Sequence, residues 1–262
     1  MVQWNLWHGC HKHSPGCAHC YVFRRDESLG KDSNLVHKTA NFGLPLQVKR
    51  DGSYKVPPGS MVWTCFTSDF FVEDADPWRE EAWDMMRQRR DCTFFFITKR
   101  IHRMADCLPQ DWGAGYPNVR VCCTVEDQKR AEYRLPILKK IPAAAKYLAC
   151  EPLLEHLDLS PWLGPWLRQV TVGGESGRGA RPCDFDWVLD IRRQCQAARV
   201  GFCYHQTGTR LLKDGKSYYI PRQFHHIQAH KAGIDWSPPQ KRQQELVYAR
   251  PSLFEINDDE EQ

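Results

Sequence analysis

Between residues 60 and 206, short runs of apolar, β-branched or aromatic residues alternate with longer amphipathic stretches. This rhythm is typical of parallel strands and of the helices that connect them. It predicts strands at residues 3–7, 61–66, 93–97, 119–124, 146–150, 169–172 and 201–204. The helical spacing of apolar side chains predicts helices at residues 78–90, 127–139 and 184–198. We therefore expect an α/β protein.

The spacing of the predicted strands favours one sheet in which a crossover helix follows each strand. Successive strands recur roughly every 23 to 33 residues, which is enough for one helix per strand. A chain of 262 residues can bury one large core, so a single barrel is as admissible as two small domains. We expect a complete or partial β/α (TIM-like) barrel over residues 1–220, with a polar, irregular insertion at 24–60 and a C-terminal extension at 221–262.

Polar residues follow almost every predicted strand at the point where the apolar run ends. They are Ser68, Asp69, Thr98, Lys99, Arg100, Glu126, Asp127, Glu151, Gly174, Glu175, His205 and Gln206. Any one of them could belong to an ordinary solvated loop. In a barrel, however, all strand ends emerge at the same face, which is where barrel enzymes keep their active sites. The recurrence of the pattern therefore predicts a site at this face.

Composition and charge narrow the class of protein. With 42% hydrophobic and 26% charged residues the chain is globular, and only its acidic end, residues 257–262, is expected to be disordered. A net charge of +4 is compatible with binding to phosphates but does not predict it. Most of the twelve cysteines lie in apolar runs, such as residues 62–66, and are interpreted as reduced core residues. With no leader and no apolar run of membrane length, we expect a cytoplasmic protein without a membrane partner.

Three cysteines, Cys10, Cys17 and Cys20, are clustered in a segment that contains glycine and proline. Thiolates hold zinc and iron–sulfur clusters, so the C-x6-C-x2-C spacing predicts a metal site. A second C-x2-C pair that would complete a zinc ribbon is missing, which favours iron–sulfur. Three thiolates leave a four-iron cluster one ligand short. The alternatives are a Cys3His zinc site, completed by His8, His11, His13 or His19, and cysteines without a ligand.

A cluster-binding loop directly after the first strand of a β/α barrel resembles the arrangement of the radical S-adenosylmethionine enzymes. More closely, the chain resembles the phage and bacterial three-cysteine-motif proteins, a family of unsettled function. The resemblance covers roughly residues 4 to 206, through segments 4–5, 9–10, 14–21, 68–69, 98–100, 125–127, 150–154 and 172–177. The chain departs from the radical enzymes in three ways. The cysteine spacing of those enzymes is C-x3-C-x2-C. An aromatic residue commonly precedes their last cysteine, and in this chain that residue is His19. Their Gly-Gly-Glu segment usually follows the second strand.

The resemblance implies two cofactors, a 4Fe-4S cluster and S-adenosylmethionine bound to the open iron. The cluster would be held by Cys10, Cys17 and Cys20. The candidate residues for S-adenosylmethionine are His19, Tyr21, Ser68, Asp69, Gly173, Gly174 and Glu175. The chemistry also implies an electron donor, such as a flavodoxin or a ferredoxin, because one electron starts the reaction.

Residue chemistry suggests where a substrate would bind. Lys99 and Arg100 offer a point charge beside a guanidinium fork, which favours a phosphate or carboxylate. Glu126, Asp127 and Glu151 are candidates to hold hydroxyl groups or to polarise an amine. Cys65 and Cys150, at strand ends, are candidate hydrogen-atom donors, although a free cysteine is usually core filler. The expected substrate is a small molecule or a nucleotide, with DNA as a possible partner because the family is associated with phages.

Two other classes of function stay open. A non-catalytic barrel that binds zinc or nucleic acid would give a colourless protein. An electron-transfer iron–sulfur protein would saturate its cluster with a fourth ligand such as His11. A further histidine group, His225, His226 and His230, is interpreted as part of a solvated helix rather than a metal site, because paired acidic or thiol residues are missing nearby.

Overall fold

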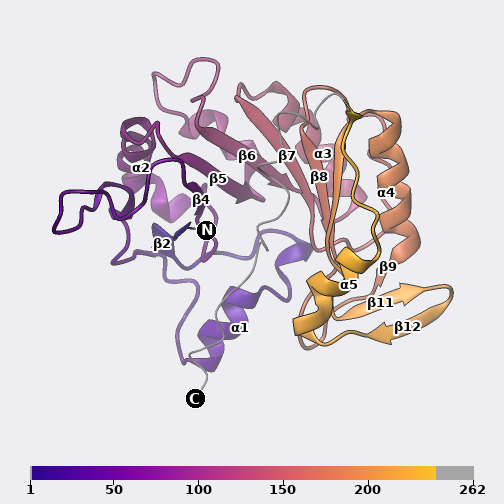
Figure 1. The fold of residues 1–262 in the computed structure, drawn as a ribbon. Coiled ribbons are helices and arrows are strands. Elements are labelled where there is room, and N and C mark those ends of the chain that lie inside the picture. The colour runs from indigo at the N-terminus through magenta and orange to yellow at the C-terminus, as the bar shows by residue number, and fades with distance from the viewer. Residues whose placement is uncertain (1, 240–262) are drawn as a thin grey trace.

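The computed structural model describes residues 2–239 of the chain. Its main element is a parallel sheet whose seven strands follow one another across the sheet in chain order (Figure 1). The strands are β1 (Val2–Trp4), β4 (Met61–Thr64), β5 (Thr93–Thr98), β6 (Val119–Thr124), β7 (Ala145–Cys150), β8 (Gln169–Gly173) and β10 (Gly201–Gln206). All seven predicted strands are confirmed, each within a few residues of its expected bounds.

The sheet curls but stays open. Within the described residues, β1 pairs in this sheet only with β4, and β10 only with β8, so the two ends do not meet. The expected barrel is therefore present in its partial form, as a half-barrel, and the complete form is wrong. Beyond β10, Phe202 exchanges two backbone hydrogen bonds of 2.8 and 2.9 Å with Trp236. This bridge lies where a closing strand would have to pair.

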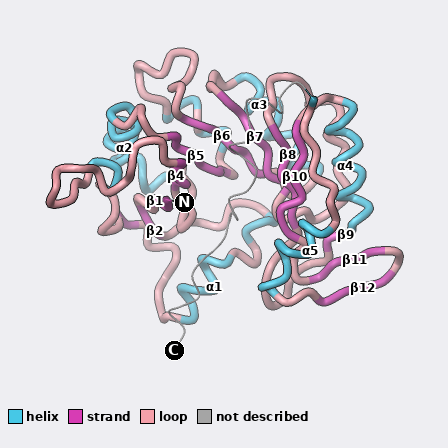
Figure 2. Tube along the Cα trace, in the orientation of Figure 1, coloured by secondary structure: helices cyan, strands magenta, loops and turns pink. Residues whose placement is uncertain are grey.

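Three helices cover the outer face of the half-barrel: α2 (Asp76–Gln88), α3 (Gln128–Lys140) and α4 (Phe185–Ala197). Each lies within two residues of its predicted bounds. In α4 the buried residues Val188, Ile191 and Cys195 recur at the spacing that puts them on one face of a helix. Other crossovers lack an α-helix. Two short 3-10 turns, η4 (Ile101–Arg103) and η5 (Ala105–Cys107), follow β5, and a loop joins β7 to β8 (Figure 2).

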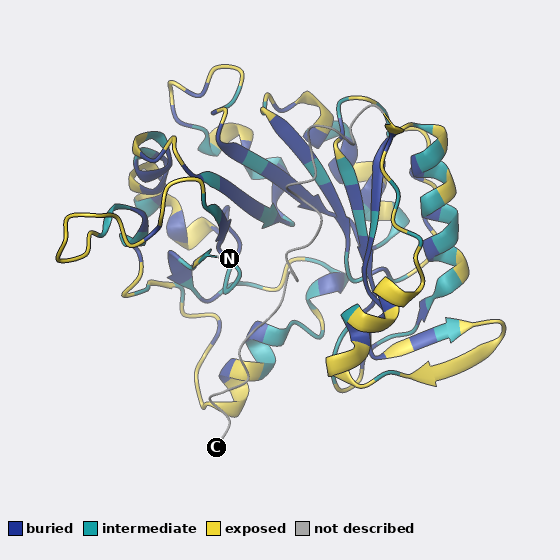
Figure 3. Ribbon diagram, viewed as in Figure 1, coloured by how far each residue is buried: buried dark blue, intermediate teal, exposed yellow. Residues whose placement is uncertain are grey.

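The two faces of the sheet contribute to different hydrophobic clusters. In β5, Phe94 and Phe96 belong to the large core beneath the helices, whereas Phe95 points to the opposite, inner face. There it packs in a small cluster with Trp63, Cys122 and Ala149. Figure 3 shows the strands as mostly buried, with exposure concentrated in the connecting segments and the C-terminal elements. Polar residues at the strand ends therefore meet side chains from the connecting segments.

The polar insertion expected at residues 24–60 is more regular than predicted. The helix α1 (Tyr21–Ser28) extends into it, because Val22 and Asp26 are buried on one side. It is followed by β3 (His37–Lys38), which pairs with β2 (Trp7–His8), and by the turn η2 (Leu44–Leu46). Further along, a single antiparallel bridge joins Val48 to Tyr54 around Gly52.

The C-terminal part holds a hairpin that the sequence did not predict. Strands β11 (Arg210–Lys213) and β12 (Lys216–Tyr219) pair with β9 (Cys183–Asp184) in a second sheet, and η6 (Arg222–Phe224) leads into α5 (His225–Lys231). Helix α5 packs against β10. None of the helices between residues 2 and 239 is both long and apolar enough to span a membrane. The acidic end, residues 257–262, lies outside the described part.

Candidate functional site

The cysteine loop, residues 9–20, connects β2 to α1 and lies against the carboxyl ends of the parallel strands (Figure 2). Residues that follow β4, β5, β6 and β8 all form hydrogen bonds with this loop. Its three cysteines, Cys10, Cys17 and Cys20, are partly exposed free thiols. The polar strand ends and the cysteine loop thus lie together.

The start of the loop is fixed by a backbone conformation that needs glycine. Gly9 has a φ of +93°, and a Cβ atom there would lie 2.6 Å from the carbonyl oxygen of Leu35. Its N–H donates to the carbonyl of Thr67 at 3.2 Å, and its carbonyl accepts from the hydroxyl of Ser68. The next N–H, of Cys10, donates to the carbonyl of Ser33 at 2.7 Å. The first thiol of the loop is therefore held close to the end of β4.

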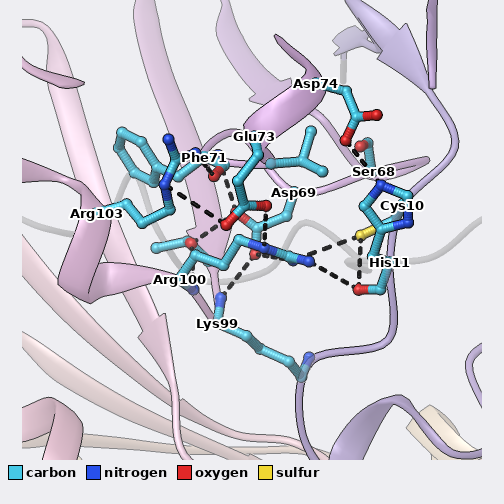
Figure 4. Close-up of polar contacts among 12 residues, drawn as sticks. Cys10, His11, Ser68, Asp69, Phe71, Glu73, Asp74, Lys99, Arg100 and Arg103 are labelled. Atoms are coloured by element: carbon cyan, nitrogen blue, oxygen red, sulfur yellow. Dashed lines mark hydrogen bonds and ion pairs between the residues drawn. The ribbon is translucent and has the colours of Figure 1, made fainter. Parts of the chain in front are cut away.

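Asp69 and Arg100 join the ends of β4 and β5 beneath Cys10 (Figure 4). Asp69, 6% exposed, accepts from the Thr98 hydroxyl at 2.7 Å and from the Lys99 N–H at 2.9 Å. Arg100, 3% exposed, lies 3.8 Å from the Asp69 carboxylate and donates to the carbonyl of His11 at 2.8 Å. Its other terminal nitrogen is 3.6 Å from the Cys10 sulfur. A buried guanidinium thus faces the first thiol.

The charges around the loop act on its thiols in opposite directions. Burial and the carboxylate of Asp69 raise the pKa of Cys10 to about 11, while Arg100 lowers it. Lys99 lies nearer the other two thiols. Burial lowers the pKa of Lys99, but Cys17, Glu126 and Cys20 raise it more, so the ammonium stays charged. A negatively charged group held by the three thiols would therefore have two cations beside it, Arg100 and Lys99.

Glu126 holds the middle of the loop from the end of β6. It is fully buried, and its Oε1 accepts from the N–H of Gly16 at 3.2 Å, while its Oε2 lies 2.8 Å from Arg134 on α3. Burial raises the pKa of Glu126, but Arg134 and Lys99 lower it below its ordinary value. A Cβ atom at Gly16 would lie 3.1 Å from Glu126 and 3.2 Å from Lys99. Gly16 thus lets the loop approach the strand ends.

Glu175, after β8, holds the far side of the loop. It accepts from the backbone N–H and the Nε of Arg181, both at 2.9 Å, and from His19 Nδ1 at 2.9 Å. A terminal nitrogen of Arg181 donates to the carbonyl of Pro15 at 2.9 Å. Burial raises the pKa of Glu175, but hydrogen bonds from Arg181 and His19 lower it below its ordinary value. The charge of Glu175 is therefore compensated within the protein.

We refer to the strand-end residues that hold the loop as the charge cluster: Asp69, Lys99, Arg100, Glu126 and Glu175. The sequence identified all five as candidates, with Asp69 and Glu175 expected to bind the cofactor and Lys99, Arg100 and Glu126 expected to bind the substrate; none was expected to hold the loop. It missed Arg134 and Arg181, which supply the counter-charges. Arg134 could have been suspected, because it lies between the buried Ala131 and Leu138 on one face of α3. Arg181 has no such signal.

A second group of polar residues lies at the ends of β7 and β10. Glu151 is 3.0 Å from His205 Nδ1 and also accepts from the side chain of Gln206. These residues meet across β8, whose last residue is Gly173. A Cβ atom there would lie 2.7 Å from Glu151 and 3.0 Å from Gln206. The room that Gly173 leaves is thus filled by protein side chains, whereas at Gly174 a Cβ would meet the backbone of Thr207 and Gly208.

Helix α5 adds two histidines to this group, which corrects the expectation of a solvated helix. His225 is only 1% exposed, and its ring contacts Ser176, Gln206 and the carbonyl of Ile220. His226 is half-buried, and its Nδ1 lies 2.9 Å from the carbonyl of His205. Burial lowers the pKa of both histidines. We call Glu151, His205, Gln206, His225 and His226 the histidine cluster; His230, the third residue of the motif, is exposed.

The remaining candidates have local partners. Asp127 caps α3 by accepting from the Arg130 N–H at 2.8 Å. The Tyr21 hydroxyl donates to the carbonyl of Phe66 at 2.5 Å. Cys65 and Cys150 are buried, and burial raises the pKa of both thiols well above its ordinary value. The charge of Cys10 also raises the pKa of Cys65, whereas Cys195 and Cys122 raise that of Cys150.

A single metal ion needs several donor atoms at about 2.0–2.3 Å from one point. Across residues 2–239, no three His, Cys, Asp or Glu side chains converge in this way. A four-iron cluster makes a different demand, because each thiolate binds a different iron atom and the sulfurs do not meet at one point. His11, a candidate fourth ligand, is instead 2.7 Å from Asp74.

Residues 2–242 match the model of a family described as protein of unknown function (DUF5131), and the chain belongs to that family. No curated protein and no solved structure matches the chain. The matched range contains the cysteine loop, the charge cluster and the histidine cluster. A family without an assigned activity leaves the function to be inferred from the chemistry of the site.

Proposed function

We propose that the protein is an iron–sulfur enzyme that uses S-adenosylmethionine to start radical chemistry. The single observation that supports this proposal is the position of the cysteine loop. All three clustered thiols lie on a loop that side chains after β4, β5, β6 and β8 of a β/α half-barrel hold by hydrogen bonds. A merely structural metal site would not need charged groups from so many strands.

The residues of the charge cluster suit an anionic cofactor. Arg100 lies 3.6 Å from the sulfur of Cys10, and Lys99 lies within the electrostatic reach of Cys17 and Cys20. Arg100 opposes the burial that raises the pKa of Cys10, and both cations would stabilise a cluster with negative charge. Cys10, Cys17 and Cys20 would hold the cluster, leaving one iron for S-adenosylmethionine. When bound, the two cofactors together supply a carbon-centred radical that takes a hydrogen atom from the substrate.

The protein side chains would then have separate tasks. Glu175 positions the loop through Arg181 and His19, so the amino group of S-adenosylmethionine must find another partner. Lys99 is the candidate for an oxyanion on a small-molecule or nucleotide substrate. The histidine cluster offers groups that can hold or move a proton near neutral pH. We propose an electron donor of the flavodoxin or ferredoxin type as the partner that supplies the reducing electron.

Anaerobic reconstitution with iron and sulfide tests the proposal. The wild-type protein should bind about four irons and show the absorbance of a 4Fe-4S cluster. Cys10→Ala, Cys17→Ala and Cys20→Ala should each lose the iron, whereas Cys92→Ala and Cys107→Ala should keep it. A colourless protein that binds zinc through the same cysteines would overturn the proposal.

A second measurement separates an enzyme from an electron carrier. S-adenosylmethionine added to the reduced protein should change the electron paramagnetic resonance spectrum and slowly release 5′-deoxyadenosine. An unchanged spectrum and no nucleoside, even with a strong reductant, would instead identify an electron-transfer protein with a saturated cluster.

A further inference from the structure

Residues 210–231 carry an excess of positive charge equal to that of the whole chain. They contain one acidic residue, Asp214, and five basic residues, which are Arg210, Lys213, Lys216, Arg222 and Lys231. Their net charge of +4 equals the net charge of all 262 residues, so the rest of the chain is neutral in sum. A protein of mild overall charge thus has one strongly basic segment.

The same segment exposes aromatic side chains. Among the described residues, nine large hydrophobic side chains are exposed, and four of them lie within ten consecutive positions of this segment: Tyr218, Tyr219, Phe224 and Ile227. Tyr219 is the most exposed of all, at 76%. Leaving an aromatic ring in water forgoes the stabilisation of burying it, so a group of such rings indicates a surface that binds something.

The hairpin places charge and ring together. Tyr219 on β12 lies directly opposite Arg210 on β11, and side chains of an opposing pair share one face of the sheet. Lys216 lies opposite Lys213, and because side chains alternate along a strand this pair shares the other face of the hairpin with Tyr218. Strand β12 is an edge of its sheet, and all four of its residues are exposed (Figure 3). The hairpin therefore presents cations and aromatic rings side by side.

The base of the hairpin is attached to the functional site. Thr209 donates its N–H to the carbonyl of Glu175 at 2.9 Å and accepts from the N–H of Ile220 at 2.9 Å. Its hydroxyl accepts from the N–H of Gly177 at 2.8 Å. The segment after β8 that holds the cysteine loop thus also holds both ends of the hairpin. A ligand on the hairpin would lie beside the carboxyl edge of the half-barrel.

We propose that the hairpin β11–β12, with η6 and α5, binds single-stranded nucleic acid. A single strand offers a chain of phosphates for the cations and bases with free faces that stack on aromatic rings. A duplex hides those faces within its base stack, and a lipid surface would favour a continuous apolar face over rings alternating with charges. The surface goes beyond the proposed radical activity and does not depend on a bound cluster.

Fluorescence anisotropy with labelled single strands of about 15 nucleotides, a length suited to such sites, tests the proposal on the full chain. Tyr219→Ala should weaken binding roughly tenfold, because a lost base stack is the main effect expected. The matched control is Tyr133→Ala, which removes an exposed tyrosine of α3, 55% accessible, and should leave the affinity unchanged. Equal losses in the two variants would overturn the proposal.

The charges are tested by their effect on salt dependence. In Arg210→Gln, which removes the charge opposite Tyr219, the slope of log affinity against log salt should fall by about 0.7, since each phosphate contact on a single strand contributes about that amount. The exposed pair Lys49→Gln and Arg50→Gln serves as the control, and its slope should not change. Equal affinity for duplex DNA, or binding only to anionic phosphatidylserine vesicles, would also overturn the assignment. Circular dichroism of each variant establishes that the fold is kept.

Discussion

The charge cluster and the histidine cluster share one edge of the sheet but carry different kinds of charge. The charge cluster pairs arginine and lysine with carboxylates, and these groups keep their charges throughout the neutral range. The histidine cluster surrounds Glu151 with imidazole and amide groups, and histidine changes its charge between pH 5 and 8. The comparison indicates a division of tasks: one group fixes the loop electrostatically, and the other can respond to protons.

The largest expected effect comes from removing Arg134, the buried arginine that compensates the charge of Glu126 in the charge cluster. Arg134→Met leaves the carboxylate of Glu126 buried without its arginine and should cost about 3–5 kcal/mol of unfolding free energy. The measurement is urea denaturation at pH 7. Arg130→Met, on the same helix, breaks a partly exposed pair with Asp127 and should cost less than about 1 kcal/mol. Adding Glu126→Gln to Arg134→Met should recover part of the loss; no recovery would mean that the pair is not the cause.

The second test acts on the far side of the loop. Glu175→Gln weakens the bonds from Arg181 and His19 and should cost about 1.5–3 kcal/mol at pH 7, towards the lower value because Arg181 is partly exposed. The folded-state pKa of Glu175 is lowered, so its contribution is present above the unfolded value and is lost as the pH falls through the folded one. The stability difference from wild type should therefore shrink in acid. Glu80→Gln, at an exposed position of α2, should show neither effect.

The third test concerns the room that Gly173 leaves in the histidine cluster. Gly173→Ala places a methyl group against Glu151 and Gln206 and should cost about 1–3 kcal/mol, because the contact is tighter than packed side chains allow. Gly43→Ala is the matched control, since a Cβ there meets nothing within 4 Å. The penalty should be smaller in a Glu151→Ala background. A penalty of the same size in both backgrounds would show that the clash lies elsewhere.

The smallest expected effect is a change in pH dependence. Burial lowers the pKa of His225, so the unfolded chain binds a proton more readily and stability falls as the pH drops below about 6.5. In His225→Gln, the decrease in melting temperature between pH 7.5 and pH 5.5 should be smaller than in wild type. The exposed His37→Gln is the control. An unchanged pH profile in His225→Gln would remove this histidine from the proton-responsive group.

Most of the fold could be predicted from the sequence, but only part of the functional site. Apolar periodicity located the strands and helices because it reflects which face of each element is buried. Closure of the barrel could not be read in this way, since it depends on whether β10 meets β1 in space. The partners of Glu126 and Glu175 were missed for the same reason: Arg134 and Arg181 contact them through the folded structure. The hairpin β11–β12 escaped because its exposed, basic strands lack an apolar run.

One contact has a consequence for how the protein is made. The bond between Arg181 and Pro15 joins residues 166 positions apart, so the cysteines leave the ribosome long before the residues that hold their loop. At synthesis rates of about 5–20 residues per second, the interval is roughly 8 to 33 s. During that time the nascent chain displays three thiols with no fixed geometry. Under the proposed function, a cluster would therefore be loaded only after residue 181 has left the ribosome, because an earlier nascent chain presents an unorganised loop.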